Sequence, residues 1–315
     1  MILITTRSLY WAFAKEPFVR QLRPVNSTPS TLMDALDLAF NFRGYGWNWS
    51  RGLYTPRETR PSNRSAFVLH VALSVAIHSF ICGTTHRAVR SFSPDGLGSI
   101  LGASIFDDTL PFHLRYLRSS IISVISGFAI YAAFQVVYNS CTIMGVLLLR
   151  QDPAQWPPSF DSPWRSTSIG DFWGRRWHQW FRQIFLVQGG YPLAFIFGRT
   201  GLVVGAFLSS GVYHYAALTC LDDKTEPWRM VVGFGMMAPG ILAERAFTRV
   251  TGRKVRGLAG WIWTMTWLIL WGNVIMDGMV RAGYFWPDTL IDGVPPLRNL
   301  VEYLVMGFDT WLHEV

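Results

Sequence analysis

The chain has 315 residues, of which 50% are hydrophobic and 15% are charged, whereas roughly a quarter of the residues in an ordinary soluble domain are charged. This composition excludes disordered, collagen-like and disulfide-stapled chains and indicates a membrane protein with several spans. The net charge of +8 comes almost entirely from Arg, with only three Lys in the chain. Because the charges lie between apolar stretches, they favour contact with membrane headgroups and argue against nucleic-acid binding.

Residues 1–65 form a polar segment rich in Arg and Pro, which includes the motif RGYGWNWS at residues 43–50. The apolar part of the first residues is too short for a signal peptide or a spanning helix. We therefore expect a polar N-terminal segment over residues 1–65, followed by one membrane domain over residues 66–315.

Apolar stretches follow one another through the rest of the chain. They cover residues 66–82, 119–149, 184–220, 230–247 and 258–276, with a weaker one at 300–312. A spanning helix needs about 20 residues, so the second stretch predicts one long or one broken helix. The third predicts two helices that turn near residues 197–201. The sequence predicts an all-α polytopic membrane protein with about six to eight transmembrane helices.

Four basic connectors separate these stretches, at residues 86–90, 115–118, 165–182 and 249–256. Such loops belong on the cytosolic side, yet a single helix over 119–149 places the second and third connectors on opposite faces. Three explanations stay open. The long stretch is a re-entrant pair, or residues 96–112 dip into the bilayer, or the third connector lies in a protein cavity.

The third connector contains DFWGRRWHQWFRQIF at residues 171–185. Thr167 or Ser168 is a candidate cap for a helix that starts near Gly170. Helical spacing then gathers aromatic residues on one side and arginines on the rest, namely Trp173, Trp177, Trp180 and Phe181 with Arg175, Arg176 and Arg182. This pattern is typical of an interfacial amphipathic helix. It equally fits guanidinium groups that bind the phosphates of a cosubstrate such as coenzyme A.

A histidine, His214, lies deep in the apolar run FLSSGVYHYAAL. Ser210 is one turn earlier on the same face, and we expect Gly211 to leave space beside the imidazole. A histidine within a membrane usually faces a cavity or a partner. Two interpretations remain, a structural histidine bonded to a neighbouring helix and a general base that acts on a hydroxyl.

Other polar residues in the apolar stretches are weaker candidates. His70 and His78 share one helix face, and Asn273 and Asp277 are four residues apart. Glu244 either lines a tunnel or pairs with Arg249. Walker, Rossmann, HExxH and nucleophile-elbow motifs are absent from the sequence, which argues against ATP-driven pumps, dehydrogenases and the common hydrolases.

Three segments together, RGYGWNWS, SIGDFWGRRWHQWFRQ and FLSSGVYH, resemble the fungal wax-synthase-like branch of the membrane-bound O-acyltransferases. Several members of this branch look like acetyltransferases that act on terpenoid and meroterpenoid alcohols. The resemblance implies several helices around an intramembrane tunnel, which acyl-CoA enters from the cytosolic side. Members usually carry further apolar helices before the first motif. This chain has none there, so it is either a shortened version or a gene model that lost its start.

The resemblance also implies site residues. The intramembrane histidine of the family corresponds to His214. The family's second polar catalytic position falls at or near His178, with Asp171 as a neighbour. We expect His214 to take the proton of an alcohol that attacks the acyl-CoA thioester, while His178 polarises the thioester or orients the substrate. We assign Arg175 and Arg176 to coenzyme A binding, and with them Trp173 and Trp177.

The predicted activity is transfer of an acyl group, foremost acetyl, from acyl-CoA to a hydroxyl of a hydrophobic secondary metabolite such as a terpenoid. We expect acyl-CoA as cosubstrate, no bound cofactor and no metal. A wax synthase acting on long-chain alcohols is the alternative within enzymes, and a transporter-like protein is the alternative without chemistry. The expected location is the endoplasmic reticulum membrane, with the bilayer, acyl-CoA and the alcohol as partners.

Overall fold

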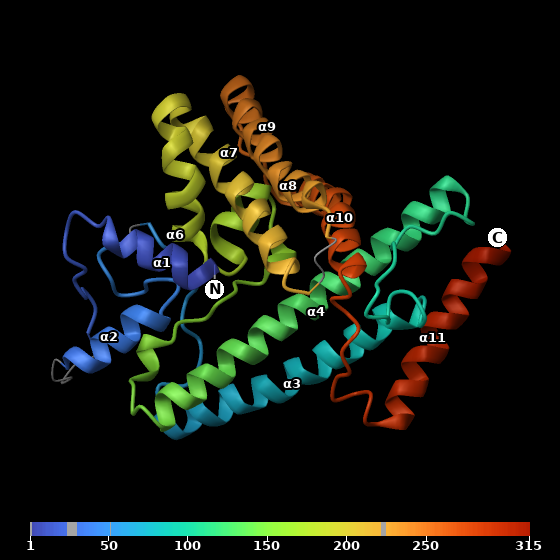
Figure 1. Cartoon of the computed structure of the whole chain (residues 1–315), viewed down its shortest axis with the longest axis horizontal. Coiled ribbons are helices and arrows are strands. Elements are labelled where there is room, and N and C mark those ends of the chain that lie inside the picture. The colour runs from blue at the N-terminus through green and yellow to red at the C-terminus, as the bar shows by residue number, and fades with distance from the viewer. Residues whose placement is uncertain (1, 24–29, 51, 222–224) are drawn as a thin grey trace. The chain divides into compact units, whose positions relative to one another are not determined.

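The computed structural model describes residues 2–23, 30–50, 52–221 and 225–315 as helices joined by loops (Figure 1). These residues contain no strand, and Arg20 and Trp47 form an isolated bridge. The all-α prediction is confirmed. The helices in chain order are α1 (Ile2–Ala12), α2 (Thr31–Phe40), α3 (Arg64–Ser91), α4 (Phe112–Leu147), α5 (Ile169–Asp171), α6 (Arg182–Phe185), α7 (Tyr191–Leu218), α8 (Pro227–Gly235), α9 (Met237–Thr251), α10 (Gly257–Arg281) and α11 (Pro295–Glu314).

Within the described residues, five helical stretches are long and apolar enough to cross a membrane. They are α3, α4, the run Arg182–Leu218, the run Pro227–Thr251 and α10. This agrees with the predicted polytopic membrane protein, although the count falls below six to eight. One reason is that the run Arg182–Leu218 counts once here, whereas we expected two helices in that region. The weak stretch at residues 300–312 is helical, in α11, but is not one of the five.

The run from α6 into α7 is a helical hairpin. Gly198 at its tip has φ 57° and ψ −140°, a backbone conformation that favours glycine. On the two limbs Gly189 faces Gly205 so closely that a Cβ on Gly189 would lie 2.0 Å from the carbonyl oxygen of Gly205. Nearer the tip, Gly201 packs in the same way against the backbone of Leu193. The turn predicted near residues 197–201 is therefore confirmed.

The chain folds into two compact units. The first unit comprises Met1–Val68, Thr142–Ser209 and Ala238–Thr264, and the second comprises Leu69–Cys141, Ser210–Met237 and Met265–Val315. In the second unit, α3 and α4 run side by side (Figure 1), and the Asn139 side chain donates to Ser74 Oγ at 3.0 Å. Since α4 is one unbroken helix, the explanation that residues 119–149 form a re-entrant pair is wrong.

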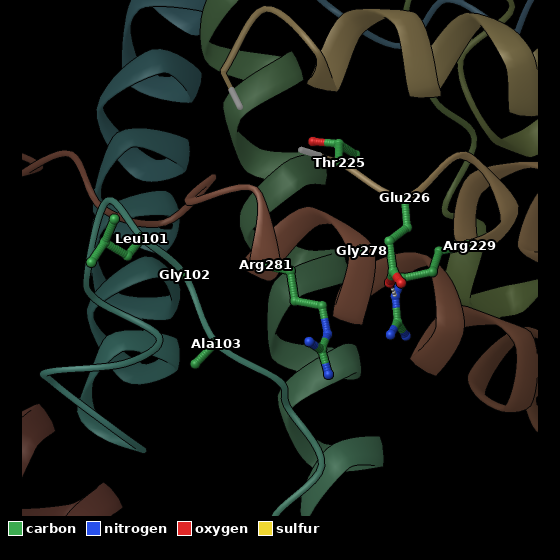
Figure 2. A pocket seen from close by; sticks show the side chains of 8 residues that line it. All are labelled: Leu101, Gly102, Ala103, Thr225, Glu226, Arg229, Gly278 and Arg281. Carbon is green, nitrogen blue, oxygen red and sulfur yellow. Dashed lines mark hydrogen bonds and ion pairs between the residues drawn. The ribbon is translucent and has the colours of Figure 1, made fainter. Parts of the chain in front are cut away.

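The polar residues of α10 bind their neighbours in the second unit. Asp277 is fully buried and accepts hydrogen bonds from Ser104 Oγ and the Ile105 amide, at 2.8 and 2.9 Å. Arg229 and Arg281 also pair with its carboxylate. Both arginines line a cavity of about 320 Å³ (Figure 2). None of the predicted site residues lines this cavity, whose lining consists of Leu101, Gly102, Ala103, Thr225, Glu226, Arg229, Gly278 and Arg281.

Candidate active site

The segment around Asp171 is helical for only two turns. Ser168 Oγ accepts a hydrogen bond from the Asp171 amide at 2.9 Å, so Ser168 is the predicted cap. After α5, residues Phe172–Arg176 form a wider π-helical turn, η3, and the chain becomes extended at Trp177, with ψ 148°. The prediction of a continuous amphipathic helix through Phe181 is wrong, because the helix ends at η3 and the next one starts only at Arg182.

Asp171 and Arg176 belong to a closed set of hydrogen bonds in the first unit. Arg176 Nε donates to Asp171 Oδ2 at 2.5 Å, and Arg176 Nη1 donates to the carbonyl oxygen of Asp161 at 2.9 Å. The Asp161 amide returns a bond to the carbonyl of Arg176 at 3.0 Å. Tyr54 completes the set by donating its hydroxyl to Asp161 Oδ2 at 2.8 Å. These bonds fold the segment against the loop before it.

Arg175 differs from its neighbour. Its side chain is 59% exposed, against 24% for Arg176, and its Nε lies 3.9 Å from Asp171. The guanidinium stacks over the Tyr54 ring at 4.5 Å from the centroid, which orients it without covering it. Of the two arginines assigned to coenzyme A, Arg175 is the one that faces outward.

His178 lies among aromatic rings. Four rings have centroids 5.5 to 6.0 Å from that of His178, namely those of Phe160, Trp177, Trp180 and Phe181. Trp177 stacks on Phe172 at 5.5 Å, and Trp173 contacts the Phe207 ring edge-on. The buried side chain of Gln179 closes the turn by donating to the carbonyls of Trp173 and Trp177, both at 2.8 Å. The first unit thus brings Trp173, Trp177 and His178 into one aromatic cluster.

Glu244 on α9 holds the start of this segment. Its carboxylate accepts from the amides of Ile169 and Gly170 at 2.5 and 3.1 Å, and from Trp263 Nε1 at 3.1 Å. Glu244 is only 9% exposed, so these bonds replace water. A negative charge at a helix N-terminus is favourable. The ion pairs of the described residues do not include the alternative pair of Glu244 with Arg249. The sequence indicates an intramembrane acid here, but not its partners.

The RGYGWNWS motif binds the loop that leads to the segment. Arg43 donates to the carbonyls of Pro157 and Pro158 at 2.6 and 2.8 Å and is buried. Gly44 has φ 68° and lies against the Trp49 ring, which leaves no room for a side chain. The motif therefore fixes the loop at Pro157 and Pro158. The sequence does not mark Asp161 and Tyr54, because a carboxylate in a Pro-rich loop gives no signal of its partners.

His214 lies in the second unit, on the regular part of α7. Its Nδ1 is 2.8 Å from the carbonyl oxygen of Ser210 and 3.4 Å from Ser210 Oγ. The imidazole stacks on Phe234 of α8 at 4.1 Å between centroids. The prediction that Gly211 leaves open space is wrong, since a Cβ there would lie 2.7 Å from the Cα of Val231. Gly211 instead allows α7 and α8 to approach closely.

The structure thus assembles Asp171, Trp173, Arg175, Arg176, Trp177 and His178 within the first unit. His214 belongs to the second unit, which is described by itself. That His214 faces the segment 171–178 stays a prediction.

Comparisons with known proteins bear on both regions. Residues 156–236 match the model of the membrane bound O-acyl transferase family. The resemblance seen in the sequence is confirmed. The match includes the segment 168–183 as well as His214.

Curated fungal relatives agree with this match. The chain is 27% identical over 249 residues to acetyltransferase spyB of Aspergillus fumigatus. The aligned residues cover 67% of this chain and 40% of that protein. It is 29% identical to O-Mevalon transferase yanI of Aspergillus niger, over 52% of this chain and 36% of the relative. Acetyltransferase sirH of Emericella nidulans is 27% identical, with coverages of 73% and 55%. The matched region therefore spans about half or less of the length of these three relatives.

Proposed function

We propose that the chain acts as an acyl-CoA-dependent O-acyltransferase in a membrane, foremost an O-acetyltransferase. The acceptor is a hydroxyl of a hydrophobic secondary metabolite such as a terpenoid or meroterpenoid. One observation carries the proposal, the family match that includes both polar segments of the site. The names of the relatives, two acetyltransferases and an O-Mevalon transferase, support acyl transfer to a metabolite over wax synthesis or transport.

His214 is the proposed catalytic base. The carbonyl of Ser210 can only accept a hydrogen bond, so its distance of 2.8 Å to Nδ1 assigns the ring proton to Nδ1. Nε2 then carries the lone pair, which suits it to take a proton from the acceptor hydroxyl. The alcohol oxygen attacks the thioester carbonyl carbon, the carbon–sulfur bond breaks, and the imidazolium returns the proton to the leaving coenzyme A thiolate.

The donor's phosphates and thioester are assigned to the first unit. Arg175 binds a phosphate of acyl-CoA, because its guanidinium is exposed and preoriented by Tyr54. Arg176 and Asp171 hold the shape of the segment, as their mutual bond and the bonds to Asp161 support. His178 polarises the thioester or orients the substrate from within its aromatic cluster, and Trp173 and Trp177 pack beside the donor. We place the protein in the endoplasmic reticulum membrane, with residues 66–315 as the acyltransferase domain.

The test is acyl transfer by membranes that contain the full chain. Microsomes receive acetyl-CoA or palmitoyl-CoA with terpenoid or long-chain alcohols, and mass spectrometry detects the esters. We expect acetyl esters of polycyclic alcohols from the parent, and at least about 100-fold less ester from His214→Ala at equal protein level. Palmitoyl esters of long-chain alcohols would instead identify a wax synthase. Absence of any ester that depends on the protein would refute acyl transfer.

A further inference from the structure

The four basic connectors differ in how their charges are neutralised. In the second unit, Arg87 pairs with Asp292 at 3.1 Å, and Arg90 pairs with Asp288 at 2.7 Å. Arg118 of the second connector is buried and pairs with Asp309 at 2.6 Å. In each case a carboxylate of the same unit neutralises the charge of the arginine.

Two further arginines of these connectors follow the same pattern, whereas the exposed Arg165 of the third connector has no ion pair among the described residues. Arg115 pairs with Asp108 at 3.0 Å, and in the first unit Arg176 pairs with Asp171. The connector at residues 249–256 differs from the other three, because none of its four basic side chains takes part in an ion pair within the described residues. This connector therefore carries charge that the described part of the protein leaves uncompensated.

The uncompensated charges form one basic patch on the first unit. Arg245 Nη1 reaches the carbonyl oxygen of Arg199 at 3.5 Å, which brings the tip of the α6–α7 hairpin to α9. All members of the basic patch are exposed and none has a carboxylate partner among the described residues. They are Arg199, Arg245, Arg249, Arg253, Lys254 and Arg256. A patch of this kind attracts anionic groups from outside the protein.

The position of the basic patch indicates where those counter-charges come from. Its connector joins the membrane-capable run Pro227–Thr251 to α10, which begins at Gly257. A loop this short between two spans lies at the surface of the bilayer. Exposed apolar side chains border it on both elements, with Val250 at 87% and Leu258 at 74% exposure. Apolar surface beside uncompensated charge fits lipid chains next to lipid phosphates.

We infer that the basic patch binds phospholipids with a net negative headgroup. Guanidinium groups bind phosphate oxygens bidentately, and each basic residue near an anionic membrane surface contributes about 1 kcal/mol to the attraction. None of the residues of the basic patch is among the proposed catalytic residues. Binding of anionic lipid to the patch would fix this end of α9 and α10 in the headgroup layer.

The experiment measures binding of phosphatidylserine to the full chain in detergent by native mass spectrometry, with phosphatidylcholine as the neutral reference. The test variant is Arg253→Gln with Lys254→Gln. The matched control is Lys15→Gln with Arg57→Gln, which removes the same two residue types from exposed positions with no carboxylate partner among the described residues. We expect the test variant to bind phosphatidylserine roughly 30-fold more weakly, and the control variant to bind like the parent.

Three results would overturn the inference. The test variant could keep the parent's affinity, both variants could lose it equally, or added coenzyme A could displace phosphatidylserine from the parent. The second result would indicate a net-charge effect, and the third would assign the basic patch to the donor. Because lipid binding is measured without any turnover, the result is independent of whether the proposed acyl transfer is correct.

Discussion

The two regions that hold the candidate site residues are built in opposite ways. The segment from Ser168 to His178 is irregular, and residues distant in the sequence fix it, foremost Glu244 and Asp161. His214 lies on a regular helix and donates its main hydrogen bond to the carbonyl of Ser210, four residues earlier. A distant contact of this kind is specific to the fold, whereas a bond to the fourth preceding carbonyl is available to any helical histidine.

Two other histidines make this point. His78 on α3 has its Nδ1 2.7 Å from the carbonyl of Ser74, and His313 on α11 has its Nδ1 2.7 Å from the carbonyl of Asp309. The local geometry of His214 therefore does not distinguish it from these two. What separates them is the group that each Nε2 meets, and the predictions below test that difference.

The largest expected effect is the loss of turnover when His214 is replaced. Because a general base acts in the transition state, His214→Ala should lower turnover about 100- to 10,000-fold and leave donor binding and membrane insertion near those of the parent. Turnover is measured by ester formation in microsomes, and donor binding by titration with labelled acyl-CoA.

His78→Ala is the matched control for this change. It removes a histidine with the same bond to a serine carbonyl from another membrane-capable helix, so we expect activity within about threefold of the parent, since general-base loss costs far more. Equal losses in both variants would reduce His214 to a structural histidine and end the proposed mechanism.

The next effect separates Arg175 from Arg176. Arg175→Gln should raise the KM for acyl-CoA about 10- to 100-fold, since a charge-assisted hydrogen bond contributes about 1.5–3 kcal/mol, and should leave the melting temperature unchanged. Arg176→Gln should instead lower the melting temperature, because it removes the bonds to Asp171 and Asp161. Donor titrations and thermal unfolding in detergent measure both. The reverse assignment would make Arg176 the phosphate ligand.

Much of the fold follows from sequence periodicity. The apolar runs and the glycines near residue 198 are local signals, so the long helices and the hairpin of α7 could be predicted from them. The pairing of the charged residues is not a local property. Ion pairs such as Arg118 with Asp309 join residues distant in the sequence, and no local pattern reveals them.

The site was predictable to a smaller extent. The cap has a local signature, and Ser168 is one of the two residues predicted for it. The break at Trp177 was not, because the aromatic spacing of residues 173–181 is typical of a helix while packing around His178 and the Gln179 bonds favour a turn. Glu244 was visible as an intramembrane acid, but its role depends on backbone amides, which a sequence does not mark.

A smaller effect is expected for Glu244. Glu244→Ala leaves two backbone amides and the Trp263 indole without their acceptor, and each such loss costs about 1–3 kcal/mol when buried. Since misplacement of a site by about 1 Å can cost about 100-fold in rate, we expect roughly a tenfold lower kcat, together with a lower melting temperature.

Two further variants define how Glu244 acts. Glu244→Gln keeps one acceptor oxygen and should lose less activity than Glu244→Ala, whereas Arg249→Gln should match the parent in both kcat and melting temperature. If Arg249→Gln reproduced the Ala phenotype, Glu244 would act through an ion pair rather than through the amides of Ile169 and Gly170.

The smallest effect concerns His313, whose two ring nitrogens both meet acceptors. Nδ1 faces the carbonyl of Asp309, and Nε2 lies 3.1 Å from Asp107 Oδ2. The Asp309 carbonyl raises the pKa of His313 above its ordinary value, partial burial opposes this, and the Asp107 carboxylate adds to the rise. Both nitrogens donate only in the imidazolium form, so protonation strengthens the contact between α11 and the loop before α4.

The sign of the pH dependence follows from this raised pKa. The stabilisation is complete below the unfolded-state pKa of about 6.5, while Asp107 stays ionised, and it is lost as the pH rises through the higher folded-state pKa. His313→Gln should therefore lower the melting temperature most under mildly acidic conditions, by no more than about 2 °C for a pair this exposed, with no difference at alkaline pH. His113→Gln, at an exposed position with no carboxylate partner among the described residues, is the control. A difference that grew with pH would mean that His313 is held neutral, and that it shares with His214 a tautomer set by the helix carbonyl alone.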